Sequence, residues 1–230
     1  MTAPPAQPDN TLLVIAKQPV PGRVKTRLVP PCTHEQAAAL AEAALADTLH
    51  TMLMVRARRR VLVLEGEPGP WLPSGFDIVP QCSGPLDERL ASAFATVSGP
   101  ALLIGMDTPQ VTPGLLTVDW QATDAWFGPA ADGGFWALGL RVPDPALLRG
   151  VPMSTPHTGA VQRARLLTAG LRVADLPQLR DVDTPADAVA VAREAPRSRF
   201  AARARKLAAA LSPSGKGELA FGENALRETA

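Results

Sequence analysis

Short, continuously apolar segments alternate with helix-favouring segments along most of this 230-residue chain. "TLLVIAK" (11–17) and "ALLIGM" (101–106) are typical of strands that are covered on both faces. Such an alternation indicates an α/β domain with a mostly parallel sheet. The expected strands are 11–17, 59–66, 76–81, 101–106, 125–130, 135–140 and 171–177, and the expected helices are 33–54, 86–97, 112–122, 158–170, 184–195 and 197–211.

The alternation predicts one three-layer, Rossmann-like domain over residues 11–211. The flanking segments 1–10 and 212–230 are expected to be flexible tails. Thr33 followed by Gln36 has the spacing of a capping box and marks the start of the first helix. No apolar run reaches the ~18 residues of a membrane span, and the N-terminus lacks the apolar core of a signal peptide. With only two cysteines in the chain, we expect a cytoplasmic protein.

The composition argues against a nucleic-acid-binding protein. The net charge is +1, aromatic residues make up 4%, and tyrosine is absent, so neither a global positive field nor a base-stacking surface is indicated. The expected basic helix at 197–211 is the segment that favours this class, and the overall charge disfavours it. Anion binding must therefore depend on local clusters of charge.

One such cluster follows the first expected strand, where the chain continues as "QPVPGRVKTRL" (18–28). In open parallel sheets, ligands bind beyond the carboxyl ends of the strands. The loop combines three cations with a glycine that permits close backbone approach and a threonine hydroxyl. We expect it to bind a phosphate chain through Gly22, Arg23, Lys25, Thr26 and Arg27.

Carboxylates follow other expected strands. Asp107 lies in "GMDTP", Asp132 in "AADGG", and Asp181 and Asp183 in "RDVDTP". Mg²⁺ prefers oxygen ligands and is commonly held by one or two carboxylates together with substrate phosphates. The sequence therefore predicts that these four acids converge opposite the basic loop and hold Mg²⁺ or Mn²⁺.

Each of these residues also has a purely structural interpretation. Lys25 and Arg27 are also compatible with ordinary solvated charges. Asp107 and Asp183 both precede Thr-Pro, a pattern of helix entry, and Asp132 precedes Gly-Gly, a pattern of turns. The joint occurrence of cations and acids at strand ends favours the binding site over these interpretations.

Several segments together resemble a bacterial glycosyltransferase-like family of the nucleotide-diphospho-sugar transferase (GT-A) superfamily. They are "AKQPVPGRVKTRL", "GPLDERLASAF", "GMDTP", "GPAADGGFWALGL" and "DVDTPAD", and they extend over roughly residues 11–195. The chain is also similar to the phospholactate and phosphoenolpyruvate guanylyltransferases, which share the "KTRL" loop and the "DVDTP" ending. It differs from these relatives at Pro85 and Asp87.

The resemblance implies a GT-A-like fold and assigns roles to positions of this chain. Lys25 and Arg27 would be the main phosphate contacts, and segment 84–90 would approach the base or ribose through Gly84 and Arg89. Ser154 and Thr155 would line the acceptor side. The implied catalytic residues are Lys25, Arg27, Asp107 and Asp132, and the implied metal ligands are Asp107, Asp132, Asp181 and Asp183.

The function that follows is a Mg²⁺-dependent transferase that uses a nucleoside triphosphate or a nucleotide-sugar and a small, in some relatives phosphorylated, acceptor. The shared "KTRL" and "DVDTP" motifs favour nucleotidyl transfer, whereas "DGGFWALGL" favours the glycosyltransferase-like family. A non-catalytic nucleotide-binding regulator of the same fold is the alternative. A homodimer is compatible with this interpretation.

Overall fold

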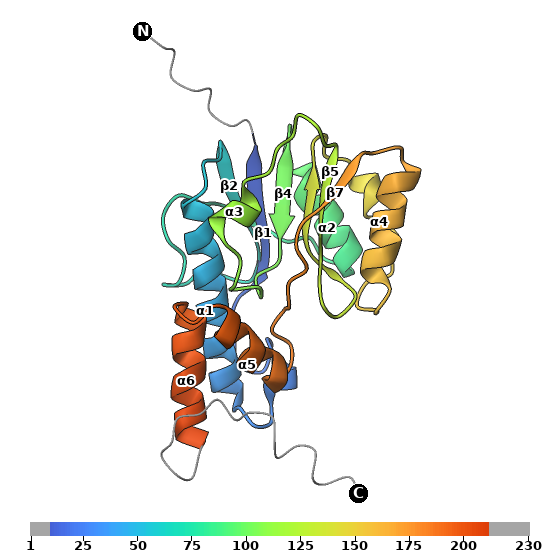
Figure 1. Cartoon of the computed structure of the whole chain (residues 1–230). Coiled ribbons are helices and arrows are strands. Elements are labelled where there is room, and N and C mark those ends of the chain that lie inside the picture. The colour runs from blue at the N-terminus through green and yellow to red at the C-terminus, as the bar shows by residue number, and fades with distance from the viewer. Residues whose placement is uncertain (1–9, 212–230) are drawn as a thin grey trace, which may run out of the picture.

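The computed structural model of the chain describes residues 10–211, and a seven-stranded sheet forms its middle layer (Figure 1). The strand order is β3-β2-β1-β4-β6-β5-β7, in which β6 runs antiparallel to both neighbours and the other adjacent pairs are parallel. The expectation of a mostly parallel α/β sheet is confirmed. The strands are β1 (Thr11–Lys17), β2 (Arg59–Glu65), β3 (Asp77–Pro80), β4 (Ala101–Ile104), β5 (Ala125–Pro129), β6 (Phe135–Leu140) and β7 (Val173–Asp175).

Helices cover both faces of the sheet because alternate residues of each central strand point to opposite sides. In β1, Leu12 and Val14 belong to a buried cluster with Leu49 of α1, whereas Leu13 belongs to a cluster with Phe94 of α2. The result is a helix–sheet–helix sandwich. Its helices are α1 (His34–Leu53), α2 (Leu86–Ala95), α3 (Pro113–Leu116), α4 (Thr158–Thr168), α5 (Pro185–Glu194) and α6 (Arg199–Leu211), with short 3-10 turns η1 (Thr26–Leu28) and η2 (Pro145–Leu147).

The capping box expected at the start of α1 is present. The Thr33 hydroxyl accepts a hydrogen bond from the Gln36 N–H at 3.3 Å, and the Gln36 side chain accepts one from the Thr33 N–H at 2.8 Å. Such a box satisfies two N–H groups that a helix start otherwise leaves unpaired. The sequence alone therefore located this boundary.

The basic C-terminal segment forms a helix that packs on the rest of the domain (Figure 1). Phe200 and Ala204 of α6 are buried with residues of α1 and α5. The carboxylate of Asp47 in α1 accepts hydrogen bonds from the backbone N–H groups of Arg199 and Phe200, at 3.1 and 2.8 Å. This carboxylate holds the start of α6, so the helix has a structural role.

The helix expected over 112–122 is wrong for most of its length, because only Pro113–Leu116 is helical. Thr117 already leaves the helical region, with φ −94° and ψ 89°. Beyond it, the Asp119 side chain accepts a hydrogen bond from the Gln121 N–H at 2.8 Å, which is a turn within the expected helix. Trp120 packs against the sheet from this irregular segment. Burial of this tryptophan and the local turn therefore outweigh the helix-start pattern of Thr112 followed by Pro113.

The expected N-terminal tail lies outside the described residues except for Asn10, which is buried and whose carbonyl accepts a hydrogen bond from the Arg58 N–H. The expected C-terminal tail, 212–230, lies outside them entirely. Within residues 10–211, none of the helices has both the length and the apolar character that a membrane span requires.

Candidate active site

The strand directions bring four chain segments to one edge of the sheet. The C-terminal ends of β1 and β4 lie side by side because these strands are parallel. Since β6 is antiparallel to β4, the turn between β5 and β6 lies at the same edge. The segment after β7 reaches it through a backbone bridge between Ala130 and Leu179. The loop after β1 and the three acid-bearing segments therefore meet at this edge.

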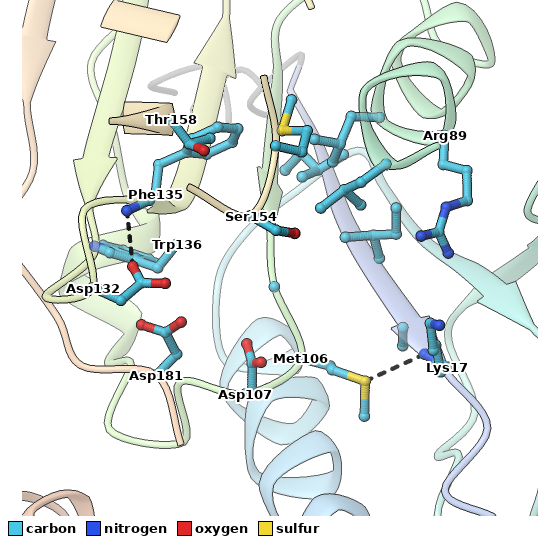
Figure 2. Close-up of a pocket in the computed structure, with 18 of the residues that line it drawn as sticks. Lys17, Arg89, Met106, Asp107, Asp132, Phe135, Trp136, Ser154, Thr158 and Asp181 are labelled. Atoms are coloured by element: carbon cyan, nitrogen blue, oxygen red, sulfur yellow. Dashed lines mark hydrogen bonds between the residues drawn. The ribbon is translucent and has the colours of Figure 1, made fainter. Parts of the chain in front are cut away.

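A cavity of about 360 Å³ opens there between α2, the sheet and the loop that precedes α4. Figure 2 shows Asp107, Asp132 and Asp181 on one side of it and Lys17 and Arg89 across from them. The apolar part of its lining is formed by Ile15, Leu86, Leu90, Leu103, Phe135, Trp136 and Met153. A pocket with an apolar wall and a few converging charges is the usual form of a small-molecule site.

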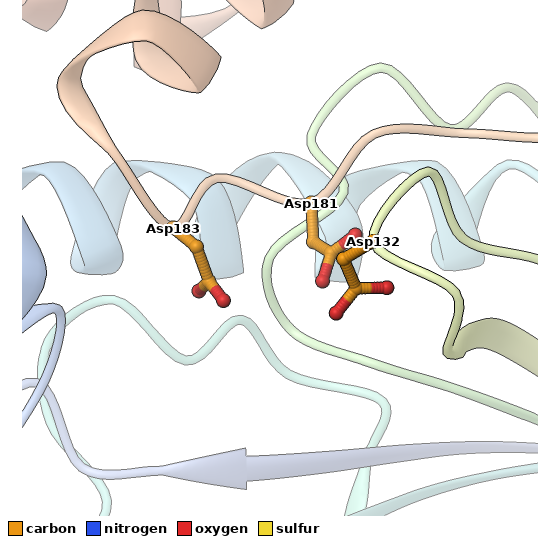
Figure 3. Close-up of side chains that lie close together, drawn as sticks. All are labelled: Asp132, Asp181 and Asp183. Carbon is orange, nitrogen blue, oxygen red and sulfur yellow. The ribbon is translucent and has the colours of Figure 1, made fainter. Parts of the chain in front are cut away.

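Three of the acids form a compact cluster (Figure 3). One carboxylate oxygen from each of Asp132, Asp181 and Asp183 lies within 4.8 Å of the others. The Gly134 N–H donates to Asp132 Oδ1 at 2.8 Å, and the Val182 N–H donates to the carbonyl of Asp107 at 3.1 Å. The second contact ties the segment carrying Asp181 and Asp183 to the loop carrying Asp107.

Lys25 joins this cluster to Asp107. Its ammonium donates to Asp107 Oδ2 at 2.6 Å and to Asp183 Oδ1 at 3.0 Å, and its side chain is only 11% exposed. Arg27 donates to Asp183 Oδ2 at 3.3 Å. Burial by itself lowers the pKa of Lys25, but the carboxylates of Asp107 and Asp183 outweigh it and raise this pKa above its ordinary value.

Lys25 is also conformationally unusual, with a left-handed backbone (φ 47°) that is uncommon for residues other than glycine. The turn that follows it, η1, is anchored by the buried Leu28. The left-handed residue turns the chain so that the ammonium points back at the acids. This local cost is offset by two charge-assisted hydrogen bonds.

Excess negative charge is evident at Asp181. Burial and the neighbouring carboxylates of Asp107 and Asp132 raise the pKa of Asp181 to about 7. The raised pKa reflects mainly the burial of this carboxyl group and, in addition, its repulsion by the neighbouring acids. Three converging carboxylates are a hard oxygen donor set, which fits Mg²⁺ or Mn²⁺.

A second cleft of about 500 Å³ adjoins the first and is rich in cations. Asp132, Asp183 and Ser154 are among the residues that line both hollows. The remaining charged and hydroxyl-bearing residues of the second cleft are Lys17, Arg23, Lys25, Thr26, Arg27 and Thr155. This juxtaposition of a basic cleft and an acidic cluster suits a phosphate chain accompanied by a divalent cation.

The turn carrying Asp132 and the loop carrying Ser154 are held together backbone against backbone. The Gly159 N–H donates to the carbonyl of Gly133 at 2.8 Å. A Cβ added to Gly133 would lie 2.1 Å from the carbonyl oxygen of Pro156, so no side chain fits there. Ser154 itself has a left-handed backbone with φ 58°. Asp132 and Ser154 therefore keep a fixed relation across the mouth of the site.

The structure thus brings most of the expected site residues together, including Asp107, the acid cluster, Lys25 and Arg27. Arg89 also lines the first cavity, the one of about 360 Å³, which is called the main cavity below. Its guanidinium donates to Glu65 at 2.9 Å and to Gln81 at 3.2 Å. The two expected glycines are not part of the site. Gly22 and Gly84 both have positive φ and shape turns, but neither of them lines either cavity.

Sequence reasoning missed Lys17, Glu65 and Gln81. Lys17 and Glu65 are the last residues of β1 and β2 and lie opposite each other in the parallel register. Gln81 follows β3 and donates to the carbonyl of Ala16 at 2.6 Å. The general rule that ligands bind beyond strand ends was the available signal, because all three residues stand at such ends.

Comparison with known proteins gives a family and a fold. A model of the family described as "Uncharacterized protein conserved in bacteria (DUF2064)" matches residues 39–155. No curated protein matches the chain. A crystal structure from Desulfovibrio desulfuricans G20, described as a "putative nucleotide-diphospho-sugar transferase", is 27% identical with a TM-score of 0.77, covering 86% of this chain and 94% of its own.

A second similar structure is the 2-C-methyl-D-erythritol 4-phosphate cytidylyltransferase from Thermus thermophilus. It is 17% identical with a TM-score of 0.52, and the alignment covers 82% of this chain and 99% of that one. At this identity the likeness concerns the fold alone. The chain therefore has the nucleotide-diphospho-sugar transferase fold, as expected from the resemblance of its motifs.

Proposed function

The chain belongs to the DUF2064 family of bacterial proteins, and from its site we propose that it is a transferase that uses a nucleotide substrate together with Mg²⁺ or Mn²⁺. The observation that carries the proposal is the contact between the basic cleft and the acidic cluster through Lys25, whose ammonium bridges Asp107 and Asp183. A ligand that spans this contact must present negative charge to one side and a cation to the other. A nucleotide polyphosphate with a divalent cation has that charge distribution.

The acid cluster of Asp132, Asp181 and Asp183 would hold the cation, which when bound offsets negative charge on the phosphates. Those cations of the basic cleft that the acid cluster does not neutralise bind the phosphate chain and stabilise the charge that develops on the leaving phosphate. Asp107 is held in place by Lys25 and faces the cavity, where it can orient the acceptor. The apolar wall of the cavity excludes water from the transferred group.

Two transfer reactions are compatible with this arrangement. In nucleotidyl transfer, an acceptor oxygen forms a bond to the α-phosphorus of a nucleoside triphosphate, the bond to the bridging oxygen breaks, and pyrophosphate leaves. In glycosyl transfer, an acceptor hydroxyl forms a bond to the anomeric carbon, the carbon–oxygen bond to the diphosphate breaks, and a nucleoside diphosphate leaves. In the second case the hydroxyl proton passes to a carboxylate of the site, for which Asp132 is the exposed member of the cluster.

Product analysis tests the proposal. The protein is incubated with Mg²⁺, each of the common nucleoside triphosphates or nucleotide-sugars, and a panel of phosphorylated acids and sugars. Release of pyrophosphate identifies nucleotidyl transfer, and release of nucleoside diphosphate identifies glycosyl transfer. Metal-dependent nucleotide binding without either product would support the regulator, and absence of nucleotide binding would refute the proposal.

A further inference from the structure

Lys17 lies where the cavities at this edge of the sheet meet. It lines the main cavity, the basic cleft, and a smaller hollow of about 210 Å³ next to Gly66. Its backbone is fixed, since it ends β1 opposite Glu65 and its N–H donates to the sulfur of Met106 at 3.2 Å. Its side chain is 47% exposed, so the ammonium is accessible to a ligand.

Three other cations of the site already donate hydrogen bonds within the protein. Lys25 is buried between two carboxylates, Arg27 donates to Asp183, and Arg89 donates to Glu65 and Gln81. The Lys17 ammonium, by contrast, lies 3.4 Å from Glu65 Oε2 and forms no hydrogen bond within residues 10–211. Its N–H donors remain free for a ligand.

The charges around Glu65, at the rim where these cavities meet, are also unbalanced. Lys17, Arg23 and Arg89 all face the single carboxylate of Glu65, at 3.4, 3.9 and 2.9 Å. One negative charge among three positive charges leaves a net positive field directed at the cavities. An anion bound at this rim would neutralise the net positive charge without displacing any short ion pair.

We propose, on the premise of a nucleotide substrate, that Lys17, aided by Arg23, is the principal phosphate-binding cation of the site. Glu65 keeps both side chains at the rim. Lys25 and Arg27, which the resemblance assigned as the main phosphate contacts, instead chiefly neutralise the acid cluster. The recognised ligand is a polyphosphate, whichever base or sugar is attached to it.

Calorimetric titration of the metal-free protein with inorganic tripolyphosphate, in EDTA at low ionic strength, tests this assignment. Tripolyphosphate probes the phosphate contacts without a base, and EDTA removes the contribution of metal ions. We expect Lys17→Met to raise the Kd about tenfold, Lys17→Arg to restore most of the affinity, and Arg27→Met to change it less than about threefold. Lys206→Met is the matched control for loss of one positive charge, because Lys206 is exposed on α6 away from these cavities, and it should leave the Kd unchanged.

An unchanged Kd in Lys17→Met, or a larger loss in Arg27→Met, would overturn the assignment. A loss in Lys206→Met equal to that in Lys17→Met would do the same, because it would indicate a diffuse charge effect. Circular dichroism melting of each variant confirms that the fold is retained. If tripolyphosphate binds with the expected dependence on Lys17 but no transferase product forms, the inference stands and the proposed reaction fails. If the parent protein does not bind tripolyphosphate in EDTA, the inference fails, and the product analysis with Mg²⁺ decides the proposed reaction separately.

Discussion

The ammonium of Lys25 lies 2.6 Å from Oδ2 of Asp107, although 82 residues separate the two in the chain. Together with its contact to Asp183, this pair places a fixed positive charge beside the acid cluster. A divalent cation in the cluster would be repelled by that charge. We therefore expect Lys25 to weaken metal binding to the nucleotide-free protein.

From this relationship we predict that Lys25→Met tightens Mn²⁺ binding to the nucleotide-free protein. We expect the affinity for Mn²⁺ to rise about tenfold. This corresponds to a small part of the repulsion energy between two charges a few ångströms apart at a partly exposed site. Electron paramagnetic resonance of free Mn²⁺ measures the Kd, and Lys206→Met serves as the charge-matched control. Weaker or equal Mn²⁺ binding in Lys25→Met would show that Lys25 does not compete with the cation.

Asp183→Asn should lower metal-dependent transferase activity by a factor of about 100 or more while the fold persists, because it removes a carboxylate shared by the acid cluster, Lys25 and Arg27. Asp175→Asn is the control, since Asp175 forms an exposed ion pair with Arg163 and lines neither cavity of the site. Product release and Mn²⁺ binding are measured for both. Normal Mn²⁺ affinity in Asp183→Asn would exclude this residue as a ligand.

The pKa of Asp181 predicts how stability depends on pH in the metal-free protein. Its folded-state pKa of about 7 is raised above the ordinary value of 3.8, so the folded protein binds this proton more tightly than the unfolded chain does. The contribution of this group to the free energy of unfolding is fully present below about pH 4 and is lost as the pH rises towards 7. We expect a loss of about 1–2 kcal/mol over that range, reduced from the full shift because the group is partly exposed.

Urea denaturation in EDTA at pH 5 and pH 7.5 measures this loss, and Asp181→Asn provides the reference because its side chain does not titrate. The free energy of unfolding of the parent should fall relative to that of the variant as the pH rises. Parallel pH profiles for the two proteins would contradict the raised pKa.

Gly133→Ala should destabilise the protein by more than about 2 kcal/mol and also impair the site. The added Cβ would lie 2.1 Å from the Pro156 carbonyl oxygen, and the residue has φ 89°. Gly150→Ala is the matched control, because Gly150 has φ 73° but open space around its Cβ position, and it should cost only about 1 kcal/mol. Thermal melting compares them, and equal losses would show that the contact between the two loops is not tight.

The sequence by itself determined the order and type of the elements. Continuous apolar runs marked β1 and β4, and Thr33 with Gln36 marked the start of α1, because these signals are local and depend on burial or capping within a few residues. The sequence also pointed to the acids and to the basic loop, since both follow strand ends. Where a local signal competed with distant packing, as for the segment around Trp120, the outcome could not be judged from residue order alone.

Only the tertiary structure decided which charges pair. The strand order places β1 beside β4 and inserts the antiparallel β6 next to β4, and this arrangement brings Lys25 to Asp107 and to Asp183, 158 residues away. It also leaves Lys17 facing a single shared carboxylate, free for a ligand. Sequence spacing does not encode such pairings, because an ion pair depends on distances across the sheet that are fixed only when all of its strands are in register.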